Sequence, residues 1–474
     1  MKTFLFGLFT AALTSALPAA EKPNVLFILV DDFGSRDLSC YGSALYETPN
    51  MDRLAASGAK FTQAYVAYPR CVPSRFGILT GKHPARVQGE RDSPHVEPDR
   101  DATLGQAFKA AGYSTSYCGK WHLGEGESNP DKVGFDTIVA AGAAGATKSH
   151  FAPYNTPRKK GGGGGDEKDD IVGLDDAPQD EYLTDRLTEE TMKFIEANKE
   201  KPFFAVLAHY AVHTPIEGKK HLAKRYEEKL ATMPKPAVEW EKESAGENLL
   251  VQNNATYAAM IESVDHGVGR LLNQLKKLGL EDNTIIVLAS DHGGLSARGG
   301  KREVATSNRP LRAGKGHLYE GGLRIPFMIR WPGTVKPGTE IATPVSTLDL
   351  MPTLTDMAGI ERPQLAGTDG LSLATLLQGG ASPQRDTFYW HNPAPRPSST
   401  ADWFSSAIRV GDLKLLDFPT EKKIELYDLA DDPGESNNLA ESRPEDRDRL
   451  LAKLNAWRKE VGASTSPKIR KKEQ

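Results

Sequence analysis

Residues 24–32 read NVLFILVDD, an apolar run that ends in two adjacent acids. The run is short, continuous and rich in β-branched residues, which is typical of a strand buried on both faces of a parallel sheet. Residues 203–208 (FFAVLA) and 284–289 (TIIVLA) repeat the pattern. These three segments therefore predict the core strands of one sheet.

Helical patterns separate these strands. The segments 50–57 and 103–111 are short, whereas 254–277 is long and carries apolar residues at helical spacing: Tyr257, Ile261, Val264, Val268, Leu271 and Leu275. Strands that alternate with helices predict an α/β domain with a doubly wound sheet.

Polar residues follow each of the three strands at the point where it ends. These are Asp31-Asp32, the segment from His209 to His213, and Asp291-His292. In open α/β sheets the ligand lies beyond the carboxyl ends of the strands, so the three clusters should face one crevice. Three carboxylates and an imidazole in one crevice would repel one another without a cation, and carboxylates favour hard ions such as calcium or magnesium.

The C-terminal part of the chain differs in character. Segments 413–417 and 423–427 predict short strands, and 444–461 predicts a terminal amphipathic helix, so this part is interpreted as a small α+β subdomain. The predicted organisation is a signal peptide over 1–20, a large catalytic domain over 21–378, the α+β subdomain over 379–463 and a charged tail over 464–474. A glycine-rich stretch over 157–170 predicts a flexible surface insertion.

The N-terminus predicts export. Met1-Lys2 is followed by an apolar run over 4–12 and by small residues up to Ala20, which is the pattern of a secretory signal peptide. The run is too short for a membrane span, which needs about 20 apolar residues, and no later segment is long and apolar enough. We therefore expect an exported protein, periplasmic or secreted, without a membrane span.

Composition excludes two classes of protein. The 474 residues contain 59 Lys and Arg against 63 Asp and Glu, a net charge of −4, which argues against a nucleic-acid-coating protein. Three cysteines rule out a disulfide scaffold. In an oxidising compartment an odd number of cysteines leaves at least one unpaired. Cys40 and Cys118 are interpreted as free thiols, with a bridge between them as the alternative.

The most specific motif begins at Cys71. Residues 71–81 read CVPSRFGILTG and match the sulfatase signature Cys-x-Pro-Ser-Arg-x-x-x-x-Thr-Gly at every fixed position. The chain therefore resembles the type I formylglycine-dependent sulfatases of the alkaline phosphatase superfamily. The resemblance implies that a maturation enzyme oxidises Cys71 to Cα-formylglycine, whose hydrated aldehyde is the nucleophile.

Further motifs extend the resemblance over nearly the whole mature chain. They are TPNMDRL over 48–54, GKWHLG over 119–124, HTP over 213–215, SDHG over 290–293, LRAGKG over 311–316, EGGLRIP over 320–326, LYDL over 426–429 and DPGE over 432–435. The resemblance implies the alkaline-phosphatase-like fold, a mixed sheet flanked by helices, with the small C-terminal subdomain.

The resemblance also implies a role for each site residue. One divalent ion, usually calcium, would be held by Asp31, Asp32, Asp291, His292 and the modified Cys71. Many sulfatases carry Asp-Asn where this chain has Asp291-His292, which bears on the identity of the metal. Lys120, Lys315 and Arg75 would neutralise charge on the sulfate oxygens. His213 would protonate the leaving oxygen, and His122 would take a proton from the hydrate.

The function implied is hydrolysis of sulfate esters by a sulfuric ester hydrolase, with sulfated carbohydrates from polysaccharides as substrates. One alternative is a phosphonate or phosphate ester hydrolase of the same superfamily, and another is a non-catalytic exported glycan-binding protein. The expected partners are a sulfated sugar and the formylglycine-generating maturation enzyme, with no nucleic acid; the oligomeric state stays open. Specificity is expected from loops around 150–170, 219–247 and 390–404, and His150 is a candidate substrate contact.

Overall fold

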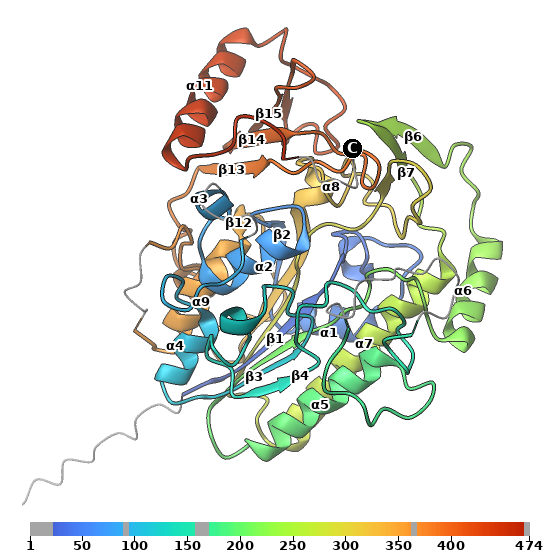
Figure 1. The fold of residues 1–474 in the computed structure, drawn as a ribbon, viewed down its shortest axis with the longest axis vertical. Coiled ribbons are helices and arrows are strands. Elements are labelled where there is room, and N and C mark those ends of the chain that lie inside the picture. Colours follow the sequence, from blue (N-terminus) through green and yellow to red (C-terminus); the bar gives the residue numbers. More distant parts are fainter. Residues whose placement is uncertain (1–21, 89–93, 157–169, 362–366, 469–474) are drawn as a thin grey trace, which may run out of the picture.

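The segment 24–30 forms strand β1 (Asn24–Val30), which lies inside a nine-stranded sheet (Figure 1). The structure is a computed structural model that describes residues 22–88, 94–156, 170–361 and 367–468. The predicted signal peptide, nearly all of the insertion over 157–170 and the last six residues of the tail lie outside the described residues.

The sheet is mixed, as predicted. Strand β1 pairs in parallel with β5 (Phe203–Ala208) on one side and with β8 (Thr284–Ser290) on the other. Strand β10 (Arg324–Arg330) runs antiparallel between β8 and β2 (Ala59–Tyr65). The remaining strands of this sheet are β3 (Ser114–Gly119), β4 (Thr137–Val139), β11 (Thr339–Ile341) and β12 (Val345–Ser346).

Both faces of the sheet are buried, which explains why β1 is apolar from Val25 to Val30. Val25 and Phe27 belong to one core cluster, and Leu26 and Ile28 belong to the other. The first cluster also contains side chains of α2 (Cys71–Thr80), α4 (Leu104–Ala110) and α9 (Leu350–Met357). The second contains side chains of α1 (Pro49–Ala56), α5 (Leu183–Ala197) and α7 (Ala255–Lys277). Helices thus cover both faces, and the doubly wound α/β interpretation is confirmed.

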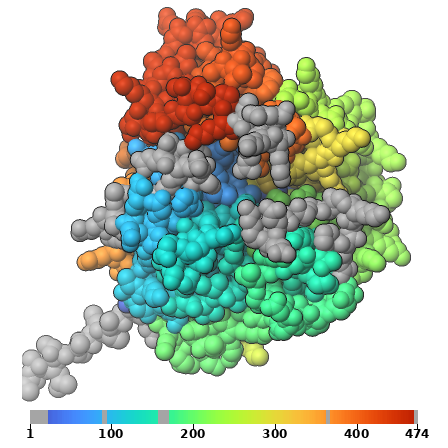
Figure 2. Space-filling model, in the orientation of Figure 1, coloured from blue at the N-terminus to red at the C-terminus, as the bar shows by residue number. Residues whose placement is uncertain are grey.

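The C-terminal part forms its own antiparallel sheet, at the top of Figure 1 and as the orange and red lobe of Figure 2. The predicted strands are β15 (Leu413–Phe418) and β16 (Lys423–Asp428), and the predicted helix is α11 (Pro444–Glu460). The sheet also contains β13 (Thr387–Asn392) and β14 (Ser405–Val410), which the sequence patterns did not indicate. The predicted α+β character is confirmed, while the domain boundaries at 378 and 463 stay predictions.

A buried ion cluster joins this sheet to the large domain. The Lys414 ammonium on β15 lies 2.8 Å from a carboxylate oxygen of Glu320 and 2.8 Å from one of Glu435, and all three side chains are fully buried. Glu320 begins α8 (Glu320–Leu323), immediately before strand β10 of the main sheet. Removing one partner from such a cluster leaves a buried charge uncompensated, so the cluster fixes how the two sheets meet.

The remaining described elements are short or lie outside the two main sheets. They are α3 (Ala85–Gln88), α6 (Lys220–Thr232), α10 (Ala374–Leu377), three short 3₁₀ helices (Ser39–Tyr41, Gly126–Ser128 and Thr347–Asp349) and a small sheet of β6 (Trp240–Glu243), β7 (Gly246–Leu249) and β9 (Ala297–Arg298). Cys40, Cys71 and Cys118 are all free thiols. Among the helices of the described segments, none combines the length and the apolar character that crossing a membrane requires.

Candidate active site

Neighbouring strands bring the predicted site residues to one edge of the sheet. Asp31 follows β1, Asp291 follows β8, Lys120 follows β3, and His213 lies in the loop after β5. Backbone hydrogen bonds continue past the strand ends: the Asp31 N–H donates to the carbonyl of Ala211 at 3.0 Å. The prediction that the three polar clusters face one crevice is therefore confirmed.

Cys71 is the first residue of helix α2, and its thiol lies at the centre of the site. Its Sγ is 3.2 Å from His292 Nε2 and 3.7 Å from Asp31 Oδ1. The start of a helix carries partial positive charge, which favours a negatively charged group there. One helical turn later, Arg75 Nε donates to Asp291 Oδ2 at 2.9 Å, so the signature places both residues in the same site.

Four buried residues of the site can together hold a metal ion. Asp31, Asp32, Cys71 and His292 each offer a ligand atom, and these atoms lie within 4.8 Å of one another. Nδ1 of His292 is 3.1 Å from the Gly293 carbonyl; if Nδ1 carries the proton, the Nε2 lone pair faces the cluster. Asp32 Oδ2 is buried and has no hydrogen-bond partner among the described residues. This donor set fits a divalent cation.

Asp291 adjoins this group of four. Its Oδ1 lies 3.5 Å from His292 Nε2 and accepts a hydrogen bond from the Asp32 N–H at 3.2 Å. Burial, together with the charge of Asp31, raises the pKa of Asp291 to about 7. Burial alone would lower the pKa of His292, but Asp291, Cys71 and Asp32 raise it to about 9. The shift of His292 reflects the negative charge gathered around it, which a bound cation would relieve.

Two lysines point into the site, Lys120 from the end of β3 and Lys315 from the loop that precedes α8. Lys120 Nζ lies 2.5 Å from Asp31 Oδ2, and Lys315 Nζ lies 2.6 Å from Asp32 Oδ1. Neither is a surface lysine, because their side chains are 0% and 3% exposed. The Lys315 loop is fixed by a hydrogen bond from its own N–H to the Gly294 carbonyl at 3.0 Å. Both ammonium groups are thus positioned to meet an anion beside Cys71.

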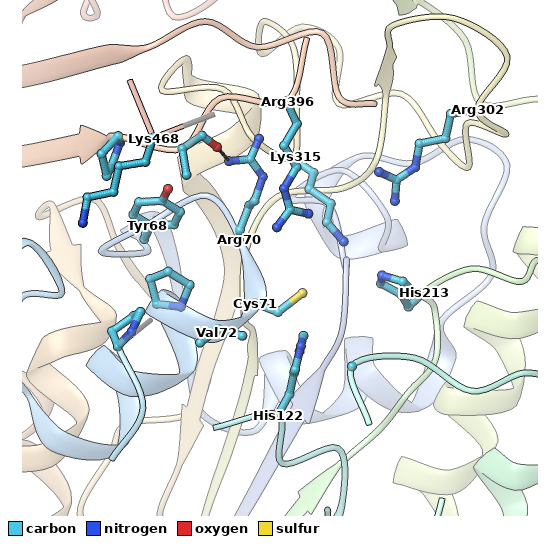
Figure 3. A pocket seen from close by; sticks show the side chains of 15 residues that line it. Tyr68, Arg70, Cys71, Val72, His122, His213, Arg302, Lys315, Arg396 and Lys468 are labelled. Carbon is cyan, nitrogen blue, oxygen red and sulfur yellow. Dashed lines mark hydrogen bonds between the residues drawn. The ribbon is translucent and has the colours of Figure 1, made fainter. Parts of the chain in front are cut away.

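The two predicted catalytic histidines also reach the site, and Figure 3 shows His122, His213 and Lys315 around the Cys71 sulfur. His122 is held with a left-handed backbone (φ 58°), as is Asp32 (φ 60°), and strain of this kind clusters at functional sites. Burial, and next the charge of Lys315, lowers the pKa of His213 to about 4. Its Nε2 lies 3.9 Å from Asp32 Oδ2.

Two other histidines lie near the site without lining the cavity. His150 Nε2 is 3.0 Å from the backbone oxygen of His213, so His150 supports the loop that carries His213. His209 is fully buried, and neither ring nitrogen has a hydrogen-bond partner among the described residues.

The site opens into a cavity of about 340 Å³. Its lining residues are Tyr68, Arg70, Cys71, Val72, Pro73, Pro94, His122, Gly145, His213, Arg302, Lys315, Pro393, Ala394, Arg396 and Lys468 (Figure 3). The expected loop 390–404 contributes to this lining, whereas no described residue of 150–170 or 219–247 does. Sequence patterns missed Arg70, Arg302, Arg396 and Gly145; for Arg70, its position next to Cys71 was the one available signal.

Comparison with known proteins identifies the family of this chain. The family model described as Sulfatase matches residues 23–360, and the model described as N-sulphoglucosamine sulphohydrolase, C-terminal, matches residues 313–460. Steryl-sulfatase of Mus musculus is 30% identical, over 92% of this chain and 81% of that protein. N-acetylgalactosamine-6-O-sulfatase of Bacteroides thetaiotaomicron is 28% identical, over 90% of this chain and 91% of that protein.

Solved structures show the same fold. The crystal structure of Ps i-CgsB in complex with k-i-k-neocarrahexaose is similar with a TM-score of 0.74 and 29% identity, over 92% of this chain and 93% of that one. The phosphonate monoester hydrolase of Agrobacterium radiobacter is 21% identical with a TM-score of 0.64, over 93% of this chain and 96% of that one, a likeness of fold alone. The chain belongs to the sulfatase family of sulfuric ester hydrolases and has their alkaline-phosphatase-like fold.

Proposed function

We propose that this protein hydrolyses sulfate esters of carbohydrates, with Cys71 converted to formylglycine. The observation that carries the proposal is the place of Cys71: it begins α2, lines a cavity, and has buried lysines, histidines and carboxylates around it. In the mature residue the oxygens of the hydrated aldehyde would stand near the present position of Sγ. One of these oxygens supplies the nucleophile for sulfur.

The ligand set proposed for one divalent ion, calcium as first choice, is Asp31, Asp32, Asp291, His292 and residue 71. Most of its donor atoms are carboxylate oxygens, the ligands that calcium prefers. When bound, the ion supplies Lewis-acid polarisation of a sulfate oxygen and helps to orient the nucleophile.

The cationic side chains are proposed to stabilise the charge that develops on the ester. Lys120 and Lys315 point toward the site within hydrogen-bond distance of Asp31 and Asp32. Arg75 is fixed by Asp291 and by the Lys120 carbonyl, which its Nη1 meets at 2.6 Å. Because these groups are held in place before substrate arrives, they need little reorganisation as the S–O bond breaks.

The two histidines are proposed to move the protons. Nδ1 of His213 is 2.7 Å from the Thr214 carbonyl, so Nε2 is the nitrogen left to protonate the departing oxygen. The negative charge of a bound ester opposes the low pKa of His213 and favours the protonated ring. His122 lies beside Cys71 with a pKa lowered by burial, as suits a base that accepts the proton of the second hydrate oxygen.

The chemistry of the cavity supports a sugar rather than a sterol. Its lining carries Arg, Lys and His side chains, and no Asp or Glu is among the described residues that line it. A volume of about 340 Å³ falls at the low end of the roughly 300–1,000 Å³ typical of small-ligand sites. Two similar proteins also support a sugar substrate: one relative is named for N-acetylgalactosamine, and one similar structure was solved with a neocarrahexaose. Export by the predicted signal peptide would bring the enzyme to such substrates.

Sulfate release from a panel of sulfated monosaccharides and oligosaccharides tests the proposal. We expect release from at least one sulfated sugar, and faster turnover of an aryl sulfate than of the matching aryl phosphate. A preparation of Cys71→Ala controls for contaminating enzymes. Preferential hydrolysis of the aryl phosphate or of a phosphonate monoester would contradict the proposal and favour the alternative activity.

Gly145 provides a prediction about how His122 is placed. A Cβ atom at Gly145 would lie 2.4 Å from both Cε1 and Nε2 of the His122 ring, which is closer than real contacts allow. Gly145→Ala should therefore displace the imidazole and lower kcat by about 10- to 100-fold. Gly142→Ala is the matched control, because its Cβ would meet only Val172 at an ordinary 3.5 Å. Equal activity of the two variants would show that the position of His122 is unimportant.

A further inference from the structure

The cavity carries more positive charge than one sulfate monoester requires. Five of its lining residues are Arg or Lys, and a sulfate monoester has a single negative charge. Lys315 faces Asp32, and Arg70 Nη2 donates to Asp402 Oδ1 at 2.5 Å, so both of these cations are already paired with a carboxylate. Arg302 differs from both.

Within the described part of the chain, no carboxylate oxygen lies within 4.0 Å of the Arg302 guanidinium. Its one hydrogen bond joins Nη1 to the Ser399 hydroxyl at 2.5 Å. The side chain is partly buried, and this burial lowers its pKa although the charges of Asp32 and Cys71 act in the opposite direction. A guanidinium that has lost water without gaining a carboxylate is ready to bind an anion.

The position of Arg302 is fixed by contacts between two loops. The loop 299–303 is joined to the loop 393–402 by the Gly299 N–H, which donates to the Ser399 carbonyl at 3.2 Å. A Cβ at Gly299 would lie 1.7 Å from the Pro397 oxygen, so only glycine permits this approach. Arg70 holds the second loop through the Ala394 carbonyl at 2.9 Å and through Asp402. The guanidinium is therefore preorganised, which reduces the entropy lost on binding.

We propose that Arg302 binds a second anionic group of the substrate, a sulfate or a carboxylate on the sugar that carries the scissile sulfate or on its neighbour. The proposal rests on the function proposed above. Arg302 lines the same cavity as His213, which we place at the leaving oxygen, so the guanidinium lies on the sugar side of the reaction (Figure 3). Arg302 is thus a specificity-determining residue for doubly anionic substrates, and Arg70 is a positioning residue for the loop beside it.

The test compares three sugars: N-acetylgalactosamine 6-sulfate, N-acetylgalactosamine 4,6-disulfate, and the 6-sulfated disaccharide in which a uronic acid is linked to the same sugar. We expect kcat/KM of the wild type to be about 10- to 100-fold higher for one or both doubly anionic sugars than for the monosulfate. A gain with the disulfate alone identifies a sulfate as the second group, and a gain with the uronate identifies a carboxylate.

Arg302→Gln should remove this preference through KM, while the monosulfate is turned over within about twofold of wild type. Arg302→Lys should keep part of the preference, because lysine retains the charge but not the paired donors. Lys301→Gln is the matched control, since it removes one charge from an exposed neighbour that does not line the cavity. Thermal unfolding of each variant verifies that the fold is intact.

Two results would overturn the proposal. One is a wild type with no preference for either doubly anionic sugar, and the other is an Arg302→Gln variant that loses kcat equally on all three, which would place Arg302 at the scissile sulfate. Calorimetry measures binding of the same sugars to Cys71→Ala, with and without Arg302→Gln. Because this measurement needs no turnover, it tests the role of Arg302 separately from the proposed sulfatase activity. Absence of sulfate release from every sugar of the wider panel would contradict the proposed function, whereas the binding preference would still decide the role of Arg302.

Discussion

Cys71→Ala should lower sulfate release by about 10⁴-fold or more, because it removes the nucleophile. A plain thiol cannot form a hydrate, so active wild-type protein should also carry formylglycine at residue 71. Mass spectrometry of the peptide should show that the thiol sulfur has been replaced by an aldehyde oxygen. Cys71→Ser keeps one hydroxyl, which can accept the sulfate but cannot expel it, and should lose turnover as well.

Cys118→Ala is the matched control for this change. Cys118 is also a buried free thiol, but it lies within β3, and its Sγ is 3.4 Å from the Leu187 carbonyl. Its pKa is raised to about 12 by burial, so it is unreactive near neutral pH. We expect Cys118→Ala to keep activity. Full activity of protein whose Cys71 thiol is shown to be intact would refute the formylglycine mechanism.

His292→Ala should lower both bound metal and sulfate release by about 100-fold or more, since changes even beyond the ligands of a metal site cost 10- to 100-fold. His292 Nε2 lies 3.2 Å from Asp32 Oδ1 and 3.2 Å from Cys71 Sγ, at the centre of the predicted ligand set. His292→Asn offers a carbonyl oxygen in place of the ring nitrogen and should keep the metal and measurable activity.

The measurement is metal content by mass spectrometry together with sulfate release for the three proteins, before and after treatment with a chelator. Calcium or magnesium should restore the chelated wild type. His266→Ala is the control, because this histidine lies on α7 with its side chain 50% exposed. Wild-type metal content and activity in His292→Ala would show that His292 is not a ligand.

Local sequence determined the core of the fold. A strand such as β1 lies between two layers of helices, so every residue from Asn24 to Val30 is buried and the run from Val25 to Val30 must be apolar. Helix α7 can also be recognised from local sequence. Asn254 caps its start by accepting a hydrogen bond from the Tyr257 N–H at 2.9 Å, and apolar residues follow at helical spacing. Such patterns can be recognised in the sequence because the residues that form a strand or cap a helix are close to one another along the chain.

The residues that the structure brings together around Cys71, and that are predicted to react, could also be picked out from the sequence, for a different reason. Cys71 and Arg75 lie one helical turn apart on α2, so a single contiguous motif contains both. Lys120 and Asp291 each follow the end of a strand, where the topology of an α/β sheet places ligands. Their predicted roles came from the resemblance to sulfatases, because periodicity and composition alone indicated only a polar crevice with a cation.

Only the tertiary structure decided what surrounds the reacting residues. Arg302 reaches the cavity because the loop 299–303 docks on the loop 393–402, about one hundred positions further along the chain. The need for glycine at 145 arises from the ring of His122, which is distant in sequence but adjacent in space. Such contacts leave no periodic pattern or motif in the chain. The sequence by itself therefore determined the three core strands of the sheet and predicted the reacting groups, whereas the docking of distant loops decided the wall of the cavity around Arg302.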